Sequence, residues 1–190
     1  MSENIYSMEV TKRNGDREPV YFDKITKRLK NLIIEGIPLR NVDPILVAQK
    51  VIQNLYDGIT TTELDELASR VCANLSSDIP DYGYLGGRLC ISNLQKMTPD
   101  NFSECCDKLM INLDKNGDIC PMLSDEVYKI ICENKELING KIEKSRDFLI
   151  DFFGFKTLEK AYLMKSNMEI VETPQYMWMR VSIGIHGKDL

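Results

Sequence analysis

The sequence predicts a mainly α-helical protein with one small β-hairpin near its N-terminus, and two observations carry this prediction. Asn14-Gly15, the dipeptide most typical of a two-residue hairpin turn, separates two short strand-like runs within residues 9–22. From residue 23 onward the apolar residues recur at the spacing of a helix instead of that of a strand. We expect a type I′ turn at Asn14-Gly15, in which both residues have positive φ.

The hairpin leads directly into the first predicted helix. Pro19 lies in the second strand, which implies an edge or a bulge because proline donates no backbone hydrogen bond. The helix is predicted to run from Asp23, its N-cap, to about Glu35, and Gly36 is suited to end it. Its expected buried face consists of Ile25, Leu29, Leu32 and Ile33.

Three more helices complete a predicted module over residues 1–97. The second starts at Asp43-Pro44, a cap followed by proline, and is expected to end at Gly58. Thr60 and Glu63 have the spacing of a capping box for the third, and residues 80–82 start the fourth, which runs to Lys96. The expected buried positions are Ile45, Ala48, Val51, Ile52 and Leu55 in the second helix and Leu64, Leu67, Ala68, Val71 and Leu75 in the third.

Residues 98–190 are predicted to form a second, helical domain. Thr98-Pro99 marks the boundary, because proline disfavours helix at the residue before it. We expect a helix over residues 102–113, a loop over 114–118 and another helix capped by Ser124.

The composition excludes several classes of protein. A net charge of −5 over 190 residues argues against a nucleic-acid-binding protein, which needs a broad basic face. No apolar run approaches the roughly 20 residues that span a membrane, and the N-terminus lacks the regions of a signal peptide. We therefore expect no nucleic-acid partner and no membrane partner.

The six cysteines include no C-x-x-C pair, and His186 is the single histidine, so the spacing of zinc ligands is absent. We expect reduced thiols in a cytosolic or nuclear compartment, and we place the protein in the cytoplasm. Cys72, Cys90 and Cys132 fall in helical patterns and are expected to be buried. A redox pair at Cys105-Cys106 is an alternative to plain burial there, and burial is favoured.

A local basic cluster is the strongest functional signal. Lys12, Arg13, Arg17 and Lys24 gather around the hairpin and the start of the helix that follows it. Backbone N–H groups at a helix N-terminus, together with several cations, make a site for a polyphosphate. Taken singly, each of these residues is more often a solvated surface side chain than a ligand.

Residues 12–15 (K-R-N-G) followed by residues 20–25 (V-Y-F-D-K-I) resemble the motif of the ATP-cone, a nucleotide-sensing module of ribonucleotide reductase large subunits. Residues 58–65, 80–82 and 92–96 resemble further cone motifs, with Ile79 and Gln95 where many eukaryotic relatives have histidine. Residues 146–163 and 172–186 resemble later segments of eukaryotic-type class I large subunits, with Thr173 in place of the usual arginine.

In that family the cone is the overall-activity site, where ATP switches the reductase on and dATP switches it off. The resemblance implies an effector nucleotide, with Mg²⁺, bound by Lys12, Arg13, Glu18, Pro19, Val20, Tyr21, Phe22, Asp23, Lys24, Thr61, Asp65 and Lys96. The four basic residues would neutralise the triphosphate, and Asp65 would accept a hydrogen bond from the ribose or contact the cation. Pro19 has no N–H, so any base contact through that group is lost.

The resemblance covers the whole chain, but the chain covers only the N-terminal portion of a large subunit. The ten-stranded α/β barrel and the catalytic cysteines of the family lie beyond it. We therefore expect a truncated or split subunit of ribonucleoside-diphosphate reductase that is inactive alone and exposes apolar surface over residues 100–190. The implied partners are the barrel, a radical-generating small subunit and further copies of the large subunit.

The alternative is a stand-alone nucleotide-sensing or interaction protein derived from the cone. Residues 146–186 favour the reductase, because a free sensor has little need of those segments. A cone-bearing transcriptional repressor would need a zinc ribbon, which the cysteine spacing does not provide.

Overall fold

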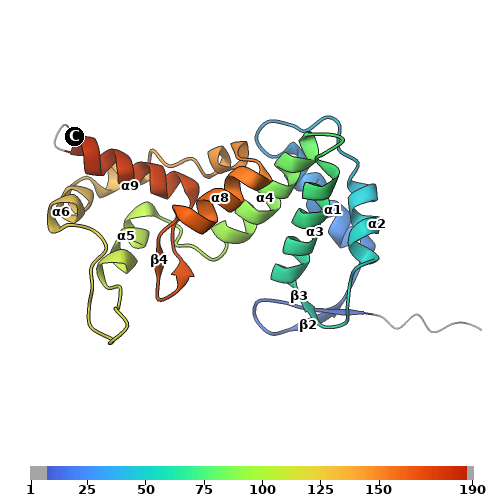
Figure 1. Cartoon of the computed structure of the whole chain (residues 1–190), viewed down its shortest axis with the longest axis horizontal. Coiled ribbons are helices and arrows are strands. Elements are labelled where there is room, and N and C mark those ends of the chain that lie inside the picture. Colours follow the sequence, from blue (N-terminus) through green and yellow to red (C-terminus); the bar gives the residue numbers. More distant parts are fainter. Residues whose placement is uncertain (1–7, 188–190) are drawn as a thin grey trace, which may run out of the picture. The chain divides into compact units, whose positions relative to one another are not determined.

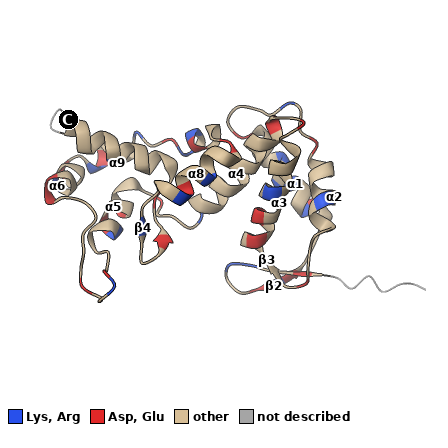
Figure 2. Ribbon diagram, in the orientation of Figure 1, with Lys and Arg blue, Asp and Glu red and all other residues tan. Residues whose placement is uncertain are grey.

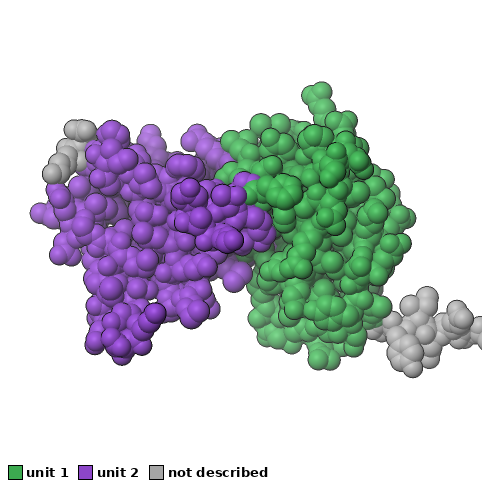
Figure 3. All heavy atoms as spheres, in the orientation of Figure 1, with its two compact units in different colours: residues 1–93, 148–153 green, residues 94–147, 154–190 purple. Residues whose placement is uncertain are grey.

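The computed structural model describes residues 8–187, and these residues form two compact units (Figures 1 and 3). The first unit contains the chain up to residue 93 together with residues 148–153, and the second contains residues 94–147 and 154 onward. Helices dominate both units, so the predicted fold class is confirmed. The domain boundary after residue 97 stays a prediction. The sequence also favours a short disordered lead over residues 1–8, and these residues lie almost wholly outside the described part of the chain.

The first unit begins with a small sheet. Strand β1 (Glu9–Thr11) pairs antiparallel with β2 (Arg17–Pro19), which confirms the hairpin. Strand β3 (Ile59–Thr60) pairs parallel with β1, which gives the strand order β2-β1-β3 and leaves Pro19 in an edge strand. The sequence did not indicate β3, because two residues are too few to show a periodicity.

The predicted type I′ turn is wrong. Gly15 has a φ of +88°, whereas Asn14 keeps a negative φ. The Lys12 N–H donates to the Asp16 carbonyl at 2.8 Å, and the Gly15 N–H donates to the Lys12 carbonyl at 2.9 Å. The loop therefore has three residues, with glycine alone in the left-handed region. The Asn14 side chain supports this loop by accepting a hydrogen bond from the Asp16 N–H at 3.2 Å.

Helix α1 (Phe22–Ile34) starts one residue before the predicted helix. Tyr21 is its N-cap residue without a side-chain capping bond, and Asp23 lies inside the first turn, so the prediction that Asp23 caps the helix is wrong. Gly36, with a φ of +64°, follows the C-cap residue Glu35 and ends the helix as predicted.

Helix α2 (Pro44–Ile52) has the predicted cap, because the Asp43 carboxylate accepts a hydrogen bond from the Ile45 N–H at 2.8 Å. The helix ends at Ile52 instead of at Gly58. The residues between them turn the chain toward β1, where the Asp57 carboxylate accepts from the Glu9 N–H at 2.8 Å. The predicted buried face is confirmed at Ala48 and Val51 and wrong at Ile45, which is exposed; Ile52 and Leu55 are half-buried, and Val47 is buried instead.

Helix α3 (Thr61–Leu75) has the predicted capping box between Thr60 and Glu63. Its buried face is rotated from the prediction: of the expected residues only Ala68 is fully buried, and the other buried positions are Asp65, Ser69 and Cys72. Figure 1 shows α1, α2 and α3 side by side, with the sheet at one end.

Helix α4 (Asp81–Gln95) is buried over most of its length. At Gly87 a Cβ atom would lie 2.3 Å from the Ile150 carbonyl oxygen, so only glycine admits the segment 148–153 beside this helix. The buried Arg88 guanidinium donates to the carbonyls of Leu32 at 2.7 Å and Ile33 at 3.2 Å, and thereby satisfies the C-terminal end of α1. Burial lowers the pKa of Arg88.

The second unit has an apolar core. Helix α5 (Phe102–Met110) ends three residues before the predicted limit at residue 113, and α6 (Asp125–Glu133) has the predicted Ser124 cap. The core residues are Phe102, Cys105, Cys106, Leu109, Ile131, Ile138, Val171, Tyr176 and Ile183. The remaining elements are α7 (Lys135–Asn139), η1 (Lys144–Leu149), α8 (Phe152–Ala161), β4 (Lys165–Ser166), β5 (Glu169–Ile170) and α9 (Pro174–His186).

Helix α9 begins with a side-chain cap. Thr173 is its N-cap residue, and the threonine hydroxyl lies 3.4 Å from the Tyr176 N–H that donates to it. A helix-capping side chain therefore lies at the position where the resemblance led us to expect arginine.

All six cysteines are free thiols. Cys72 and Cys90 are buried as predicted, whereas Cys132 is exposed, so its predicted burial is wrong. Burial raises the pKa of Cys105, and it raises the pKa of Cys106 to about 12, which makes both inert as nucleophiles and argues against a redox pair. Within residues 8–187 no helix is both long and apolar enough to cross a membrane.

Candidate nucleotide-binding site

The candidate site lies in the first unit, where the hairpin meets the first turn of α1 (Figures 1 and 2). The Glu18 carboxylate on β2 joins two lysines, because one of its oxygens lies 2.9 Å from Lys12 Nζ and 2.9 Å from Lys24 Nζ. Lys12 follows β1 directly and Lys24 is the third residue of α1, so three segments contribute to one ionic cluster.

The charges of this cluster support one another. The hydrogen bond from Lys12, and then the one from Lys24, lowers the pKa of Glu18. The hydrogen bond to Glu18 raises the pKa of Lys12. A single anionic oxygen between two ammonium groups has the same surroundings that a phosphate oxygen prefers.

The residues that join β2 to α1 expose two aromatic rings beside this cluster. Tyr21 is 51% exposed and Phe22 37% exposed, and Lys24 Nζ lies 5.0 Å from the centre of the Tyr21 ring. Asp23 is exposed in the first turn of α1. The Val20 N–H is already used by the Met8 carbonyl at 2.8 Å, and Pro19 has no N–H.

Two arginines reach across the unit to α3 and α4. Arg13, in the hairpin loop, donates to the side-chain oxygen of Asn93. Arg28 of α1 forms a two-fold pair with Asp65 of α3, with Nε 2.6 Å from one carboxylate oxygen and Nη2 2.8 Å from the other. Arg28 Nη2 also lies 3.5 Å from Ser92 Oγ.

Arg28, Ser92 and Asn93 were not among the site residues predicted from the sequence. A signal for Arg28 existed, because it follows Lys24 by four residues and therefore lies on the same side of α1. Ser92 and Asn93 lie in the segment 92–96 that resembles a cone motif, but nothing in the sequence pointed to their partners Arg28 and Arg13, which are distant along the chain.

The predicted residues are therefore brought together only in part. Thr61 is the half-buried first residue of α3, and Asp65 lies one turn further along that helix. Lys96 follows α4 and belongs to the second unit, so its part in the site stays a prediction. Among the described residues, no group of three or more His, Cys, Asp or Glu side chains is placed to hold a metal ion.

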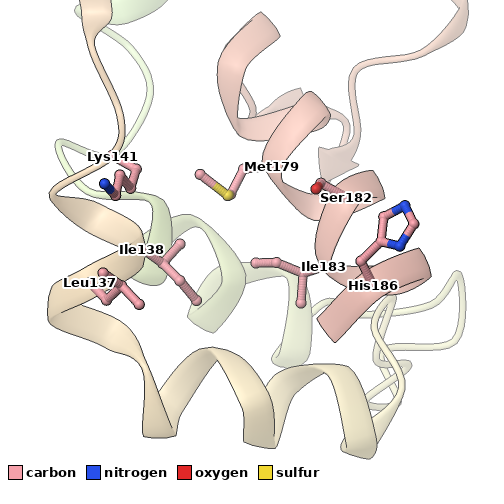
Figure 4. Close-up of a pocket in the computed structure, with 7 residues that line it drawn as sticks. All are labelled: Leu137, Ile138, Lys141, Met179, Ser182, Ile183 and His186. Carbon is pink, nitrogen blue, oxygen red and sulfur yellow. The ribbon is translucent and has the colours of Figure 1, made fainter. Parts of the chain in front are cut away.

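A hollow in the second unit is unrelated to any predicted site residue. It has a volume of about 280 Å³ and lies between α7 and α9 (Figure 4). Its wall is mainly apolar and consists of Leu137, Ile138, Lys141, Met179, Ser182, Ile183 and His186.

Comparison with known families defines the class of this protein. Residues 8–97 match the ATP cone domain, and residues 148–190 match the ribonucleotide reductase all-alpha domain. Residues 8–97, most of which lie in the first unit, are thus an ATP cone, a domain that binds a nucleotide effector.

The similarity extends along almost the whole chain. The chain is 46% identical over 185 residues to the ribonucleoside-diphosphate reductase large chain 2 of Saccharomyces cerevisiae, 48% identical over 185 residues to the large subunit of Caenorhabditis elegans and 47% identical over 184 residues to that of Monkeypox virus. These alignments cover 96%, 97% and 96% of this chain but 21%, 23% and 24% of the relatives. The chain belongs to the ribonucleoside-diphosphate reductase large-subunit family and matches its N-terminal region, about a fifth to a quarter of the length of these relatives.

Proposed function

We propose that this chain is the regulatory N-terminal part of a ribonucleoside-diphosphate reductase large subunit and that its cone binds ATP and dATP. The observation that carries the proposal is the Glu18 carboxylate between Lys12 and Lys24 at the start of α1, because these two ammonium groups are held where a phosphate group can replace the carboxylate. The match of residues 148–190 to the all-alpha reductase domain favours this function over a stand-alone sensor.

The parts of the nucleotide have separate sets of partners in this proposal. Lys12, Arg13 and Lys24, with Lys96, neutralise the triphosphate. The exposed rings of Tyr21 and Phe22 offer flat apolar surfaces to the base, and Glu18, Pro19, Val20 and Asp23 line the same segment. Thr61 and Asp65 approach the nucleotide from the start of α3.

In this proposal Mg²⁺ is bound mainly by the phosphate groups of the nucleotide, which supply oxygen ligands for Mg²⁺ in many nucleotide-binding sites. Asp65 is poorly suited to be its main protein ligand, because both of its carboxylate oxygens are engaged by Arg28. Asp23, which is exposed at the start of α1, is the better candidate.

The activity of the whole enzyme and its partners are also proposals. The names of the relatives support the reduction of ribonucleoside diphosphates, with the nucleotide acting through a coupling free energy between the cone and subunit assembly. Trp178, Val181 and Ile185 are exposed along one side of α9, which supports contact with the rest of the large subunit or with a second copy. We further propose a radical-generating small subunit as partner and a cytoplasmic location.

Thermal unfolding of the chain with and without nucleotide tests the proposed function. ATP and dATP are each expected to raise the Tm by an amount that grows with the logarithm of the ligand concentration above the Kd, because a ligand that binds only the folded state stabilises it. The Lys12→Ala, Lys96→Ala double variant is expected to lose this shift, and Lys30→Ala, an exposed lysine of α1, serves as the control. A folded wild-type chain whose Tm is unaffected by either nucleotide would contradict the proposal.

A further inference from the structure

The Arg28–Asp65 pair is asymmetric in its exposure. The Asp65 side chain is 8% exposed, whereas the Arg28 side chain is 31% exposed. The carboxylate is therefore the inner partner and the guanidinium the outer one. A ligand that approaches this pair from solvent meets Arg28 before it meets Asp65.

The two partners also differ in how many of their hydrogen-bonding atoms are engaged. Nε and Nη2 of Arg28 engage both oxygens of Asp65, so the negative charge of the carboxylate is already matched. Arg28 Nη1, in contrast, donates no hydrogen bond to any of residues 8–187. A guanidinium group has five N–H donors, so Arg28 can still bind an anion while it remains fixed by Asp65.

A second arginine is held in a similar manner. Arg13 is exposed and donates to Asn93, which is only 8% exposed. Asn93 directly follows Ser92, the residue of α4 that Arg28 approaches. Two guanidinium groups are thus fixed by buried acceptors and reach consecutive residues of one helix. Lys24, on the same side of α1 as Arg28, adds a third cation.

We propose that Arg28 is a direct phosphate ligand of this site and that Asp65 acts through it as a positioning residue. This inference rests on the proposed function, because it assigns the polyphosphate arm of the nucleotide to Arg28. It also reverses the role expected for Asp65, which touches neither the ribose nor the cation. The planar fork of arginine matches phosphate oxygens, and a carboxylate that fixes the fork reduces the conformational freedom lost on binding.

The inference is tested by titrating three ligands into the full chain: ATP, dATP and inorganic tripolyphosphate. Arg28→Gln is expected to weaken all three by a similar factor of about ten or more, because each loses a charge-assisted hydrogen bond. Asp65→Asn, which keeps the size of the side chain, is expected to weaken all three by a comparable factor. The Arg28→Gln, Asp65→Asn double variant is expected to bind no worse than Arg28→Gln alone, since the two residues act as one unit.

Tripolyphosphate has neither ribose nor base, so it separates the two roles of Asp65. Loss of ATP and dATP binding in Asp65→Asn with unchanged tripolyphosphate binding would overturn the inference, because the carboxylate would then contact the nucleoside. Unchanged binding of all three ligands by Arg28→Gln would overturn it as well. Arg28→Lys keeps the charge without the fork and is expected to restore part of the affinity lost in Arg28→Gln.

A matched control lies on α3. Arg70 forms an exposed pair with Glu66 at 3.4 Å, and both Arg70→Gln and Glu66→Gln are expected to leave all three affinities unchanged. A wild-type chain that binds ATP while Arg28→Gln behaves like wild type would refute only the further inference. A folded wild-type chain that binds none of the three ligands would refute the proposed function together with it.

Discussion

Two arginine–carboxylate pairs, one in each unit, have similar geometry and different surroundings, and in both the carboxylate is buried. In the second unit, Arg180 Nε and Nη2 lie 2.5 and 3.1 Å from the Glu172 oxygens; in the first, the matching distances from Arg28 to Asp65 are 2.6 and 2.8 Å. Glu172 has no exposed surface and also accepts the Met164 N–H at 2.9 Å. The Arg180 side chain is 17% exposed, about half the value for Arg28.

The difference shows that a buried ion pair does not by itself mark a binding site. Arg180–Glu172 stands beside the apolar core of its unit, where the Glu172 charge helps to raise the pKa of Cys105 and Cys106 after the larger effect of burial. The Arg28–Asp65 pair belongs to the same site as the cations Arg13 and Lys24, and its arginine is partly exposed to solvent. The first pair stabilises a fold, and the second holds an arginine that can receive a ligand.

Breaking the Arg180–Glu172 pair is expected to have the largest effect on the free energy of unfolding. Glu172→Gln leaves Arg180 without its charged partner in a nearly buried place, and the free energy of unfolding is expected to fall by about 3 kcal/mol. Urea unfolding followed by circular dichroism measures this change. A loss below that of Asp65→Asn would contradict the structural role assigned to this pair.

Breaking the Arg28–Asp65 pair is expected to have a smaller effect on the free energy of unfolding. Asp65→Asn lowers the free energy of unfolding by about 1–2 kcal/mol, because the partly exposed Arg28 regains contact with water. The same urea experiment provides the value. Equal losses in Asp65→Asn and Glu172→Gln would remove the distinction between the two pairs.

The exposed ionic cluster at the hairpin is expected to show its effect in pKa values. The folded state lowers the pKa of Glu18 below its ordinary 4.5, so its stabilising contribution is present above pH 4.5 and is lost as the pH falls through the lower folded pKa. A carbon-detected NMR titration of Glu18 measures this value directly. In the Lys12→Met, Lys24→Met variant the pKa should return toward its ordinary value, and an unchanged pKa would show that the lysines do not contact Glu18 in solution.

The smallest expected difference between the two units is in the reactivity of their cysteine thiols. The first unit contains two buried thiols, Cys72 and Cys90, and the second contains the exposed Cys120 and Cys132 beside the buried Cys105 and Cys106. A chromogenic disulfide reagent is expected to modify two thiols rapidly and the rest only after unfolding. Mass spectrometry identifies the sites, and rapid modification of Cys72 would contradict the packing of the first unit.

The sequence predicted the features whose causes are local. The cap at Asp43-Pro44, the capping box at Thr60 and the terminating Gly36 each depend on a few neighbouring residues, and all are present. The type I′ turn failed because the Asn14 side chain stabilises a longer loop. Of these motifs, Asn14-Gly15 and the Thr60 capping box also lie in segments that carried the family resemblance, which the comparisons confirm.

Features that depend on residues distant in the sequence could not be predicted from the sequence. The buried face of α3 was wrong because Asp65 and Ser69 are polar and gave no apolar signal; Asp65 is buried because Arg28, 37 residues away, pairs with it. Asn93 is in contact with Arg13 across 80 residues. The basic residues could be recognised from the sequence. Their pairing with Asp65 and Asn93 could be seen only in the folded structure.

Calorimetric titration of ATP into the full chain shows whether the cone is a nucleotide site built on ordered cations. We expect saturable binding at one nucleotide per cone, retained in Lys30→Ala and strongly weakened in the Lys12→Ala, Lys24→Ala variant. A folded chain that releases no heat of binding with ATP, or that binds ATP equally well without Lys12 and Lys24, would contradict it.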